Sequence, residues 1–464
     1  MQNRIIERWR DVCAGRETAA VLAPTGECLR TWAEIDKESR SLARMLEGDP
    51  GGVALQTGNH PAFPAWLLAC LRSGRAACLL DTEVFGEART HVEKQLGITV
   101  RIEAARGRLH AVPAAGASPA APDPAILYKL ACGSSPWPQP VGFTADQLVA
   151  DADQVCGAMG IRETDINYGV IPFAHSYGFS NLVTPLLCRG IRLVVAGDPL
   201  PHALESGLAA TGATVLPAVP AMFRGLLSAS SLPPTLRLCV SAGTRLDPWL
   251  ADQFREKFHR KIHSFYGTTE CGGICFDGSP GRQAEPGFIG QPIDGVAIEL
   301  PNHPEGAKIC VRSAAIGGCP DAPACQPSDL LIRQADGFRI VGRDSDWINV
   351  AGKKVSPAAV ERVLGRFPGI SDVLVCGVED SWRGQEICAL IAAASPIDRS
   401  ALRRHCAAHI AAWKCPRRFE FRSAIPEGPN GRINRAEAET IFSPPTRERF
   451  ISSPPEKAVM DLQT

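Results

Sequence analysis

Strand, helix and strand follow one another repeatedly in the first half of the chain, and this alternation constrains the fold more than any other feature. Gly52 to Gln56 is a short apolar run, Pro61 to Arg75 is rich in Leu and Ala, and Ala76 to Leu80 is apolar again. Segments of the same kind recur between Ile126 and Ser241. Because parallel strands need a crossover connection, which is usually a helix, the alternation predicts a large α/β body built on a mostly parallel sheet.

The pattern changes twice toward the C-terminus. After Pro286 short strands separated by Gly and Pro predict a β-rich segment, about residues 286–342, that closes a body formed by residues 1–342. A polar break follows, and strands and helices then alternate again, which predicts a separate α+β domain over residues 343–442. Residues 443–464 contain Ser-Pro-Pro twice and are expected to form a disordered tail. Residues 100–124, rich in Ala, Gly and Pro, are expected to be a connecting excursion outside the core.

The composition excludes several classes of partner. Lys and Arg together number 49, and so do Asp and Glu, so no global field attracts nucleic acid or a membrane surface. No apolar run approaches the ~20 residues that a membrane span needs, and the N-terminus is a charged amphipathic segment. The 17 cysteines are scattered, odd in number and mostly flanked by apolar residues, which indicates reduced core thiols. We therefore expect a soluble, cytoplasmic protein.

A short polar block in the middle of the chain has the residue types of a nucleotide site. It reads Tyr266-Gly-Thr-Thr-Glu270 and is expected to be a loop at the end of a buried strand, where ligands bind in open α/β sheets. Gly267 frees the backbone, while Thr268 and Thr269 offer hydroxyl and N–H groups to an anion. Glu270 can hold a divalent cation, and Tyr266 offers a flat face to a base. The alternative is a polar turn that caps an ordinary strand.

Five further blocks stand before and after this one. They are Tyr128–Val141, with Gly133-Ser-Ser135; Pro172-Phe-Ala-His-Ser-Tyr-Gly-Phe179; Ser241-Ala-Gly-Thr-Arg-Leu-Asp-Pro248; Ser328-Asp-Leu330 with Asp336–Arg343; and Pro429-Asn-Gly-Arg-Ile-Asn-Arg435. In order and approximate spacing the set resembles the adenylate-forming acyl ligases, which include acyl-CoA synthetases, the adenylation domains of peptide synthetases and beetle luciferase. The resemblance extends over nearly the whole chain. It implies an acyl-CoA synthetase-like fold, with a large multi-sheet α/β body and a small mobile α+β C-terminal domain.

The resemblance also implies which residues hold ATP and Mg²⁺. In chain order these are Gly133, Ser134 and Ser135 in the phosphate loop; Ser241, Ala242 and Gly243 in the adenine turn; Tyr266 stacked on adenine, beside Gly267; Thr268 and Thr269 at the α-phosphate; Glu270 on magnesium; and Asp329 and Arg343 at the ribose. Two of these blocks have plainer interpretations. The first is a proline-rich surface loop, and the adenine turn is also an ordinary strand-to-helix connection that Asp247 caps.

The remaining implied residues belong to catalysis and to the thiol acceptor. His175 would lie near the carboxylate and the thiol tunnel, although a histidine in front of a helix is more often a cap. Ser345 stands at the family's hinge position, and Gly352, Lys353 and Lys354 match the loop that swings onto the thiol tunnel. The catalytic set implied by the resemblance is Arg432, Thr269, Glu270 and His175.

In two blocks the chain departs from the family's pattern. Gln139 stands where the phosphate loop carries a lysine, with Pro136 and Pro140 at the positions of two glycines. Arg432 stands at the position of the catalytic lysine that bridges the acyl carboxylate and the α-phosphate. Arginine keeps the charge, but its planar fork is larger than an ammonium group.

The expected activity is that of an acid–thiol ligase. A small carboxylic acid, fatty or otherwise not an amino acid, is activated to acyl-AMP and passed to CoA or to the phosphopantetheine of an acyl carrier protein. One alternative is a ligase dedicated to a carrier protein. The other, favoured by Gln139 and Arg432, is a pseudoenzyme that binds a nucleotide or an acyl-adenylate.

Overall fold

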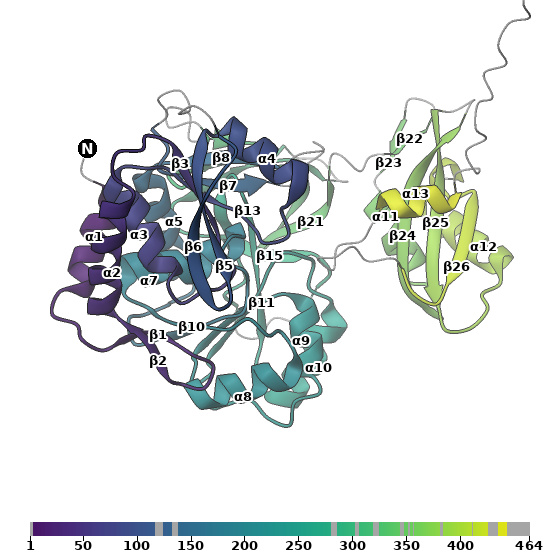
Figure 1. Cartoon of the computed structure of the whole chain (residues 1–464). Coiled ribbons are helices and arrows are strands. Elements are labelled where there is room, and N and C mark those ends of the chain that lie inside the picture. Colours follow the sequence, from purple (N-terminus) through teal and green to yellow (C-terminus); the bar gives the residue numbers. More distant parts are fainter. Residues whose placement is uncertain are drawn as a thin grey trace, which may run out of the picture. The chain divides into compact units, whose positions relative to one another are not determined.

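The computed structural model of the chain forms two compact units, residues 1–345 and 346–464 (Figure 1). It describes residues 3–116, 124–131, 138–279, 285–301, 306–318, 324–343, 348–350, 353–355, 357–380, 384–410, 412–425 and 435–442.

The first unit is built on a long mixed sheet. Among the described residues this sheet has twelve strands, in the spatial order β17 (Ala307–Lys308), β20 (Asp329–Gln334), β21 (Gly337–Arg343), β15 (Phe288–Pro292), β14 (Gly272–Phe276), β13 (Ile262–Thr268), β12 (Leu238–Ser241), β11 (Val215–Ala218), β9 (Ile166–Gly169), β10 (Arg192–Val195), β1 (Ala19–Leu22) and β2 (Cys28–Thr31). From β1 to β13 neighbouring strands run parallel. From β13 to β17 they run antiparallel. The sheet therefore changes character at β13, the strand that carries Tyr266.

A second sheet in this unit is parallel at its centre. The described chain gives it the order β6 (Arg108–Pro113), β5 (Ile98–Ala105), β3 (Gly52–Gln56), β4 (Ala77–Leu79), β7 (Leu127–Ala131) and β8 (Gln139–Phe143), with the two edge strands antiparallel to their neighbours. The expectation that residues 100–124 lie outside the core is therefore wrong for β5, where Ile102 is fully buried and pairs with Leu55 on β3. Strand β6 is an edge strand of the described sheet without a buried residue, which agrees with that expectation.

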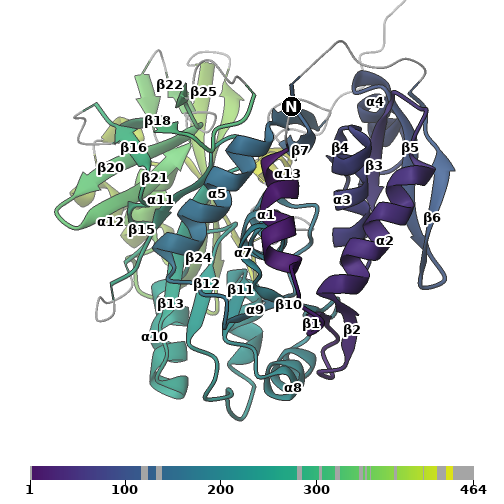
Figure 2. The same cartoon turned by 90° about the vertical axis from the view of Figure 1, so that its left-hand side faces the viewer.

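Helices connect these strands and share one core with both sheets. They are α1 (Arg4–Cys13), α2 (Trp32–Met45), α3 (Phe63–Ser73), α4 (Gly86–Gln95), α5 (Ala145–Ala158), α6 (Ser176–Gly178), the π-helical turn Phe179–Val183, α7 (Thr184–Arg189), α8 (Pro201–Thr211), α9 (Pro220–Leu226) and α10 (Pro248–Phe258). Helices α1, α5 and α7 lie side by side, and α2 packs on α3 (Figure 2). Helix α3 is apolar all round, and nine consecutive residues, Phe63 to Leu71, are buried, which is the pattern of a helix inside a core.

A small antiparallel sheet accompanies the end of this unit. Its described strands are β16 (Val296–Glu299), β18 (Cys310–Ser313) and β19 (Ala324–Cys325). Together with β15, β20 and β21 they make up the β-rich segment that the Gly- and Pro-punctuated sequence indicates.

The second unit folds around its own five-stranded sheet in the described residues. The strands are β22 (Ile348–Val350), β23 (Lys353–Val355), β24 (Ile370–Asp380), β25 (Gly384–Ala393) and β26 (Arg418–Arg422). The helices are α11 (Pro357–Leu364), α12 (Arg399–His409), a 3₁₀ turn at Ala412–Lys414, and α13 (Arg435–Phe442). Two faces of the sheet are apolar, one packed by α11 and α12 and the other by α13.

No helix in the described part of the chain is both long enough and apolar enough to cross a membrane.

Candidate nucleotide and acyl site

The Tyr266–Glu270 block is the tip of a tight hairpin, and the expectation of a loop that begins at Tyr266 is wrong. Strand β13 continues through Thr268, where it pairs with Gly272 at the start of β14, and all five residues of β14 are buried. The reversal is thus confined to residues 269–271. The glycines after the block predict an interruption of regular structure. In the structure they allow a second strand, β14, to begin directly after the turn.

Two glycines make this hairpin possible. A Cβ on Gly267 would lie 2.4 Å from the carbonyl oxygen of Gly272. Gly272 has a φ of +69°, and a Cβ there would lie 2.3 Å from Asp151 Oδ1. Any side chain at either position therefore collides with the strand partner or with a buried carboxylate.

Hydrogen bonds fix the turn and present its side chains. Thr268 Oγ1 accepts from the Cys271 N–H at 3.2 Å, and the Gly317 N–H donates to the Glu270 carbonyl at 2.8 Å. The side chains of Thr268, Thr269 and Glu270 are partly exposed. Mg²⁺ prefers oxygen ligands, whether it is free or bound to a phosphate. The hydroxyl and carboxylate oxygens of these three residues therefore fit a magnesium nucleotide.

The predicted adenine and ribose residues lie in contact. The Tyr266 hydroxyl donates to Asp329 Oδ2 at 2.9 Å, and each residue is 7% exposed. Burial, together with the negative charge of Asp329, raises the pKa of Tyr266 well above its ordinary value, so the phenol stays a donor. Asp329 on β20 also pairs with Arg343 on β21, although the Arg343 side chain lies outside the described residues.

This contact depends on the shape of the sheet. Between β13 and β20 the sheet order places β14, β15 and β21, which at normal strand spacing would separate the two strands by about 19 Å. The sheet must curl strongly for Tyr266 to reach Asp329. Its antiparallel half encloses one apolar cluster that contains Tyr266, Ile289 and Leu331.

The adenine turn lies at the same edge of the sheet. Strand β12 ends at Ser241, which pairs with Ser264 on β13, two residues before Tyr266. The Ser241 hydroxyl is buried and has no hydrogen-bond partner among the described residues, and Gly243 has a φ of +86°. Asp247 also caps α10 by accepting from the Trp249 N–H at 3.0 Å, so the capping interpretation holds as well. Ala242 is buried beneath this turn.

His175 occupies the N-cap position of α6, and its side chain pairs with an aspartate that sequence reasoning missed. His175 precedes α6, and its side chain makes no capping hydrogen bond. Its Nε2 lies 2.9 Å from Asp81 Oδ2, and the histidine side chain is 46% exposed. The hydrogen bond from His175 lowers the pKa of Asp81 below its ordinary value. Asp81 follows β4, the neighbour of β7, and nothing in the local sequence marks it as a partner of residue 175.

Asn59 anchors the segment that carries His175. Its Nδ2 donates to the carbonyls of Gly169, Ile171 and Ala196, and its Oδ1 accepts from the Phe173 N–H at 2.8 Å. Asn59 follows β3 in the second sheet, whereas Gly169 and Ala196 belong to the ends of β9 and β10 in the first. One side chain therefore ties the histidine block to both sheets.

Several predicted residues lie outside the described parts of the chain. These are Gly133, Ser134 and Ser135 of the phosphate loop, the hinge residue Ser345, Gly352 of the tunnel loop, and Arg432. Lys353 and Lys354 form β23 by backbone pairing with Val350 and Asn349, and their side chains are not described.

The strands that flank the phosphate loop are described, and they place Gln139. It begins β8 directly opposite Ala131, the last residue of β7, and it is exposed. Strand β8 is an edge of its sheet in the described chain, which is where a proline such as Pro140 is tolerated. The interpretation as a proline-rich surface loop is therefore wrong for residues 139–141, which belong to a strand.

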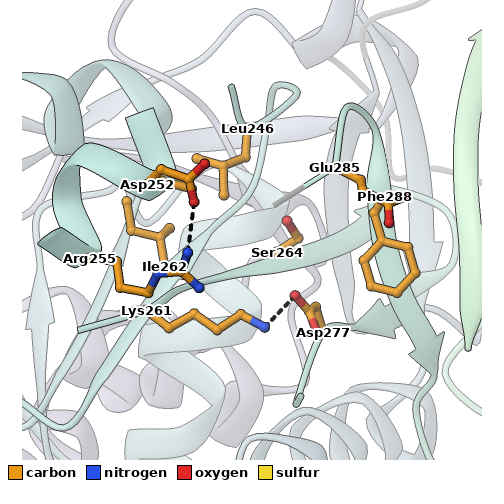
Figure 3. A pocket seen from close by; sticks show the side chains of 10 residues that line it. Leu246, Asp252, Arg255, Lys261, Ile262, Ser264, Asp277, Glu285 and Phe288 are labelled. Atoms are coloured by element: carbon orange, nitrogen blue, oxygen red, sulfur yellow. Dashed lines mark hydrogen bonds and ion pairs between the residues drawn. The ribbon is translucent and has the colours of Figure 1, made fainter. Parts of the chain in front are cut away.

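One cavity among the described residues is too small to be the nucleotide site. It lies at the start of β13 and has a volume of about 20 Å³, room for about one water molecule. Figure 3 shows the ion pair of Lys261 with Asp277 and that of Arg255 with Asp252 on its walls. Phe288 lies on the opposite wall. The cavity shares β13 with the Tyr266 hairpin but contains none of its turn residues.

Comparisons with known proteins decide the family. Residues 133–317 match the model of the AMP-binding enzyme family, and residues 359–432 match the model of the AMP-binding enzyme C-terminal domain. The chain belongs to the AMP-binding enzyme family. It is therefore a ligase of the AMP-forming acid–thiol class, as the motif resemblance implies.

Individual relatives and structures agree with this assignment. A sulfoacetate–CoA ligase of Cupriavidus necator is 27% identical over 91% of this chain and 89% of its own. A fatty acid–[acyl-carrier-protein] ligase, ScoC of Streptomyces coeruleorubidus, is 30% identical over 50% of each. The crystal structure of ATP-bound MatB from Rhodopseudomonas palustris superimposes with a TM-score of 0.80 over 96% of this chain and all of that one, at 18% identity. The predicted acyl-CoA synthetase-like fold is confirmed.

Proposed function

We propose that the protein uses ATP to convert a carboxylic acid that is not an amino acid into an acyl-adenylate, and that it then transfers the acyl group to the thiol of CoA. The observation that supports this most is the hydrogen bond between Tyr266 and Asp329 at the edge where β12 and β13 end. It joins the two residues to which the family pattern assigns adenine and ribose, and Tyr266 lies on the strand that leads into the Thr269–Cys271 turn.

In the first half-reaction a carboxylate oxygen of the acid attacks the α-phosphorus of ATP, and pyrophosphate leaves. We assign Thr268 and Thr269 to the α-phosphate and Glu270 to Mg²⁺, which would neutralise charge on the phosphates. Asp329 and Arg343 would hold the ribose. These residues act by positioning the reactants, a contribution that is worth several powers of ten in rate for well-oriented reactants.

In the second half-reaction the thiol sulfur attacks the acyl carbonyl, and AMP leaves. We place His175 near that carbonyl, with Asp81 fixing which ring nitrogen faces the substrate. The tunnel residues would be Gly352, Lys353 and Lys354, and the hinge would be Ser345. The implied cytoplasmic location supplies both ATP and CoA.

The identity of the acid is the finer part of the proposal. The two relatives named above act on sulfoacetate and on fatty acids, so a fatty or other acyl acid remains our choice, with a short anionic acid as the first competitor. The acyl-carrier-protein ligase among these relatives also keeps carrier-protein phosphopantetheine as an alternative acceptor.

The test is acid-dependent exchange of radioactive pyrophosphate into ATP. A panel of sulfoacetate, a medium-chain fatty acid, benzoate and an amino acid separates the substrate classes. Glu270→Gln should lower the exchange rate about 10²- to 10³-fold, the usual loss for one group that stabilises transition-state charge. Arg432→Lys and Arg432→Ala, compared with wild type, decide whether Arg432 acts in this step.

A pseudoenzyme is the competing function, because Gln139 replaces a phosphate-loop lysine. Normal ATP binding with no exchange on any acid would establish it. Exchange that survives in Arg432→Ala would remove Arg432 from the mechanism without affecting the ligase assignment.

A further inference from the structure

A lysine is buried in strand β7, which is otherwise apolar. This residue is Lys129, and its side chain is 1% exposed. Its ammonium group lies 3.9 Å from Asp151 Oδ2 and 3.4 Å from Ser180 Oγ. The ring centroids of Phe143 and Phe179 lie 4.6 and 5.2 Å from it. Burial lowers the pKa of Lys129, and the charge of Asp151 opposes that shift.

Asp151 connects Lys129 to the β13–β14 hairpin. It lies on α5 and its side chain is 2% exposed. Its Oδ2 accepts from the Ser180 hydroxyl at 2.5 Å, and its Oδ1 accepts from the Gly273 backbone N–H at 3.0 Å. The same Oδ1 atom lies 2.3 Å from the position that a Cβ on Gly272 would take. Asp151 thus contacts the residues on both sides of the 272–273 peptide bond, directly after the Thr269–Cys271 turn.

A buried ion pair is a costly way to fill a core, since apolar residues of equal volume are often as stable or more stable. What an apolar side chain cannot provide is an acceptor for the Gly273 N–H. The Oδ1 atom of Asp151 meets that need, and Lys129 compensates the charge that comes with it. The π-helical turn at Phe179–Val183 brings Ser180 to the second oxygen, which orients the carboxylate.

We propose that Asp151 is a positioning residue for the Thr269–Cys271 turn, held as an oriented acceptor by Lys129 and Ser180. It contacts no substrate. It sets where the turn presents Thr269 and Glu270 by holding the N–H of Gly273. The effect on catalysis rests on the proposed function, whereas the effect on the turn does not.

The test compares two double variants that differ in whether the side chain at position 151 can accept a hydrogen bond from Gly273. Lys129→Met with Asp151→Asn removes both charges and keeps an oxygen acceptor for Gly273. Lys129→Met with Asp151→Leu removes both charges, keeps the number and branching of the heavy atoms at position 151, and has no acceptor. Both avoid an unpaired buried charge, and thermal unfolding shows that each is folded before any other comparison.

Two measurements, the kcat of pyrophosphate exchange and the hydrogen-exchange protection of Gly273, test the proposal. We expect the exchange kcat of the Asn variant to stay within about threefold of wild type and that of the Leu variant to fall about 10²-fold, with the KM for ATP nearly unchanged in both. Hydrogen exchange, measured without substrate, should show that the Gly273 amide loses protection only in the Leu variant.

Equal protection of Gly273 in the two variants overturns the proposal, whether or not the wild type turns over. Unequal protection with equal kcat overturns the catalytic part. A wild type that is inactive on every acid defeats the proposed function instead, and the protection of Gly273 then still decides whether Asp151 holds the turn.

Discussion

Two hairpins approach Asp151 from different sheets, and they differ in how firmly their surroundings restrict them. The β13–β14 hairpin lies inside the long sheet, with β12 and β15 as its outer neighbours. The β7–β8 hairpin lies at an edge of the second sheet in the described chain, and β8 has no further strand beside it. The first hairpin retains all five residues of the nucleotide block, whereas the second carries Gln139 and Pro140 at positions of a lysine and a glycine. An interior hairpin with buried partners leaves no room for substitution, and an edge strand tolerates it.

The largest effect should come from breaking the interior hairpin. Gly272→Ala introduces a Cβ at 2.3 Å from Asp151 Oδ1 at a φ of +69°. Gly74→Ala is the control, because Gly74 has a similar φ of +72° with no atom within 4 Å. The control should cost about 1–2 kcal/mol for the left-handed conformation, and Gly272→Ala about 1–3 kcal/mol more for overpacking. Urea denaturation measures both; equal losses would mean that Asp151 yields to the new methyl group.

A smaller effect should come from restoring charge to the edge hairpin. Gln139→Lys places an ammonium group on the first residue of β8, opposite the last residue of β7. One charge near a phosphate in exposed surroundings is worth about 1 kcal/mol, so the rate of pyrophosphate exchange should rise by about three- to tenfold. Gln139→Met is the uncharged control and should give no increase. An unchanged rate in Gln139→Lys would show that position 139 in this hairpin does not interact with the phosphates.

The smallest effect should come from the pair of Asp81 and His175, which lies outside both hairpins. The hydrogen bond from His175 holds the pKa of Asp81 below 3.8, so the folded state binds a proton there less readily than the unfolded chain. The stabilisation by Asp81 is therefore complete above about pH 4 and is lost as the pH falls through the lower, folded-state pKa. The difference in unfolding free energy between wild type and Asp81→Asn should shrink as the pH falls below about 4. A difference that does not change with pH would exclude the ionic contribution.

The functional roles assigned to residues of the interior hairpin stay predictions, and its secondary structure was predicted wrongly in part. Tyr266 and Asp329 were assigned to one nucleotide site by motif, and they do share a hydrogen bond. The loop assigned to residues 266–270 was wrong, because strand β13 continues through Thr268. Its partner β14 begins with glycines, and only the structure shows that these glycines approach Gly267 closely. Strand β5 was missed because only Ile98 and Ile102 of its eight residues are buried, which leaves no alternating pattern for sequence reasoning to find.

Asp81 and Asp151 had no recognisable signal of their own, since a carboxylate acquires its role from the partner that faces it. Lys129 did have one. A lysine between Tyr128 and Leu130, in a run with the composition of a buried strand, is a charge that must find a partner. The sequence indicates that such a partner exists, but it does not say on which element the partner lies.

By itself the sequence determined the general alternation of strands and helices, the family and the residue types expected at the nucleotide site, because these depend on local patterns and on short motifs. Tertiary structure alone decided which residues meet. The curl of the antiparallel half-sheet brings Tyr266 to Asp329, and the packing of α5 against β7 and β14 lets Asp151 serve both Lys129 and Gly273. Such contacts join residues far apart in the chain, and their energy comes from burial and geometry that no short segment contains.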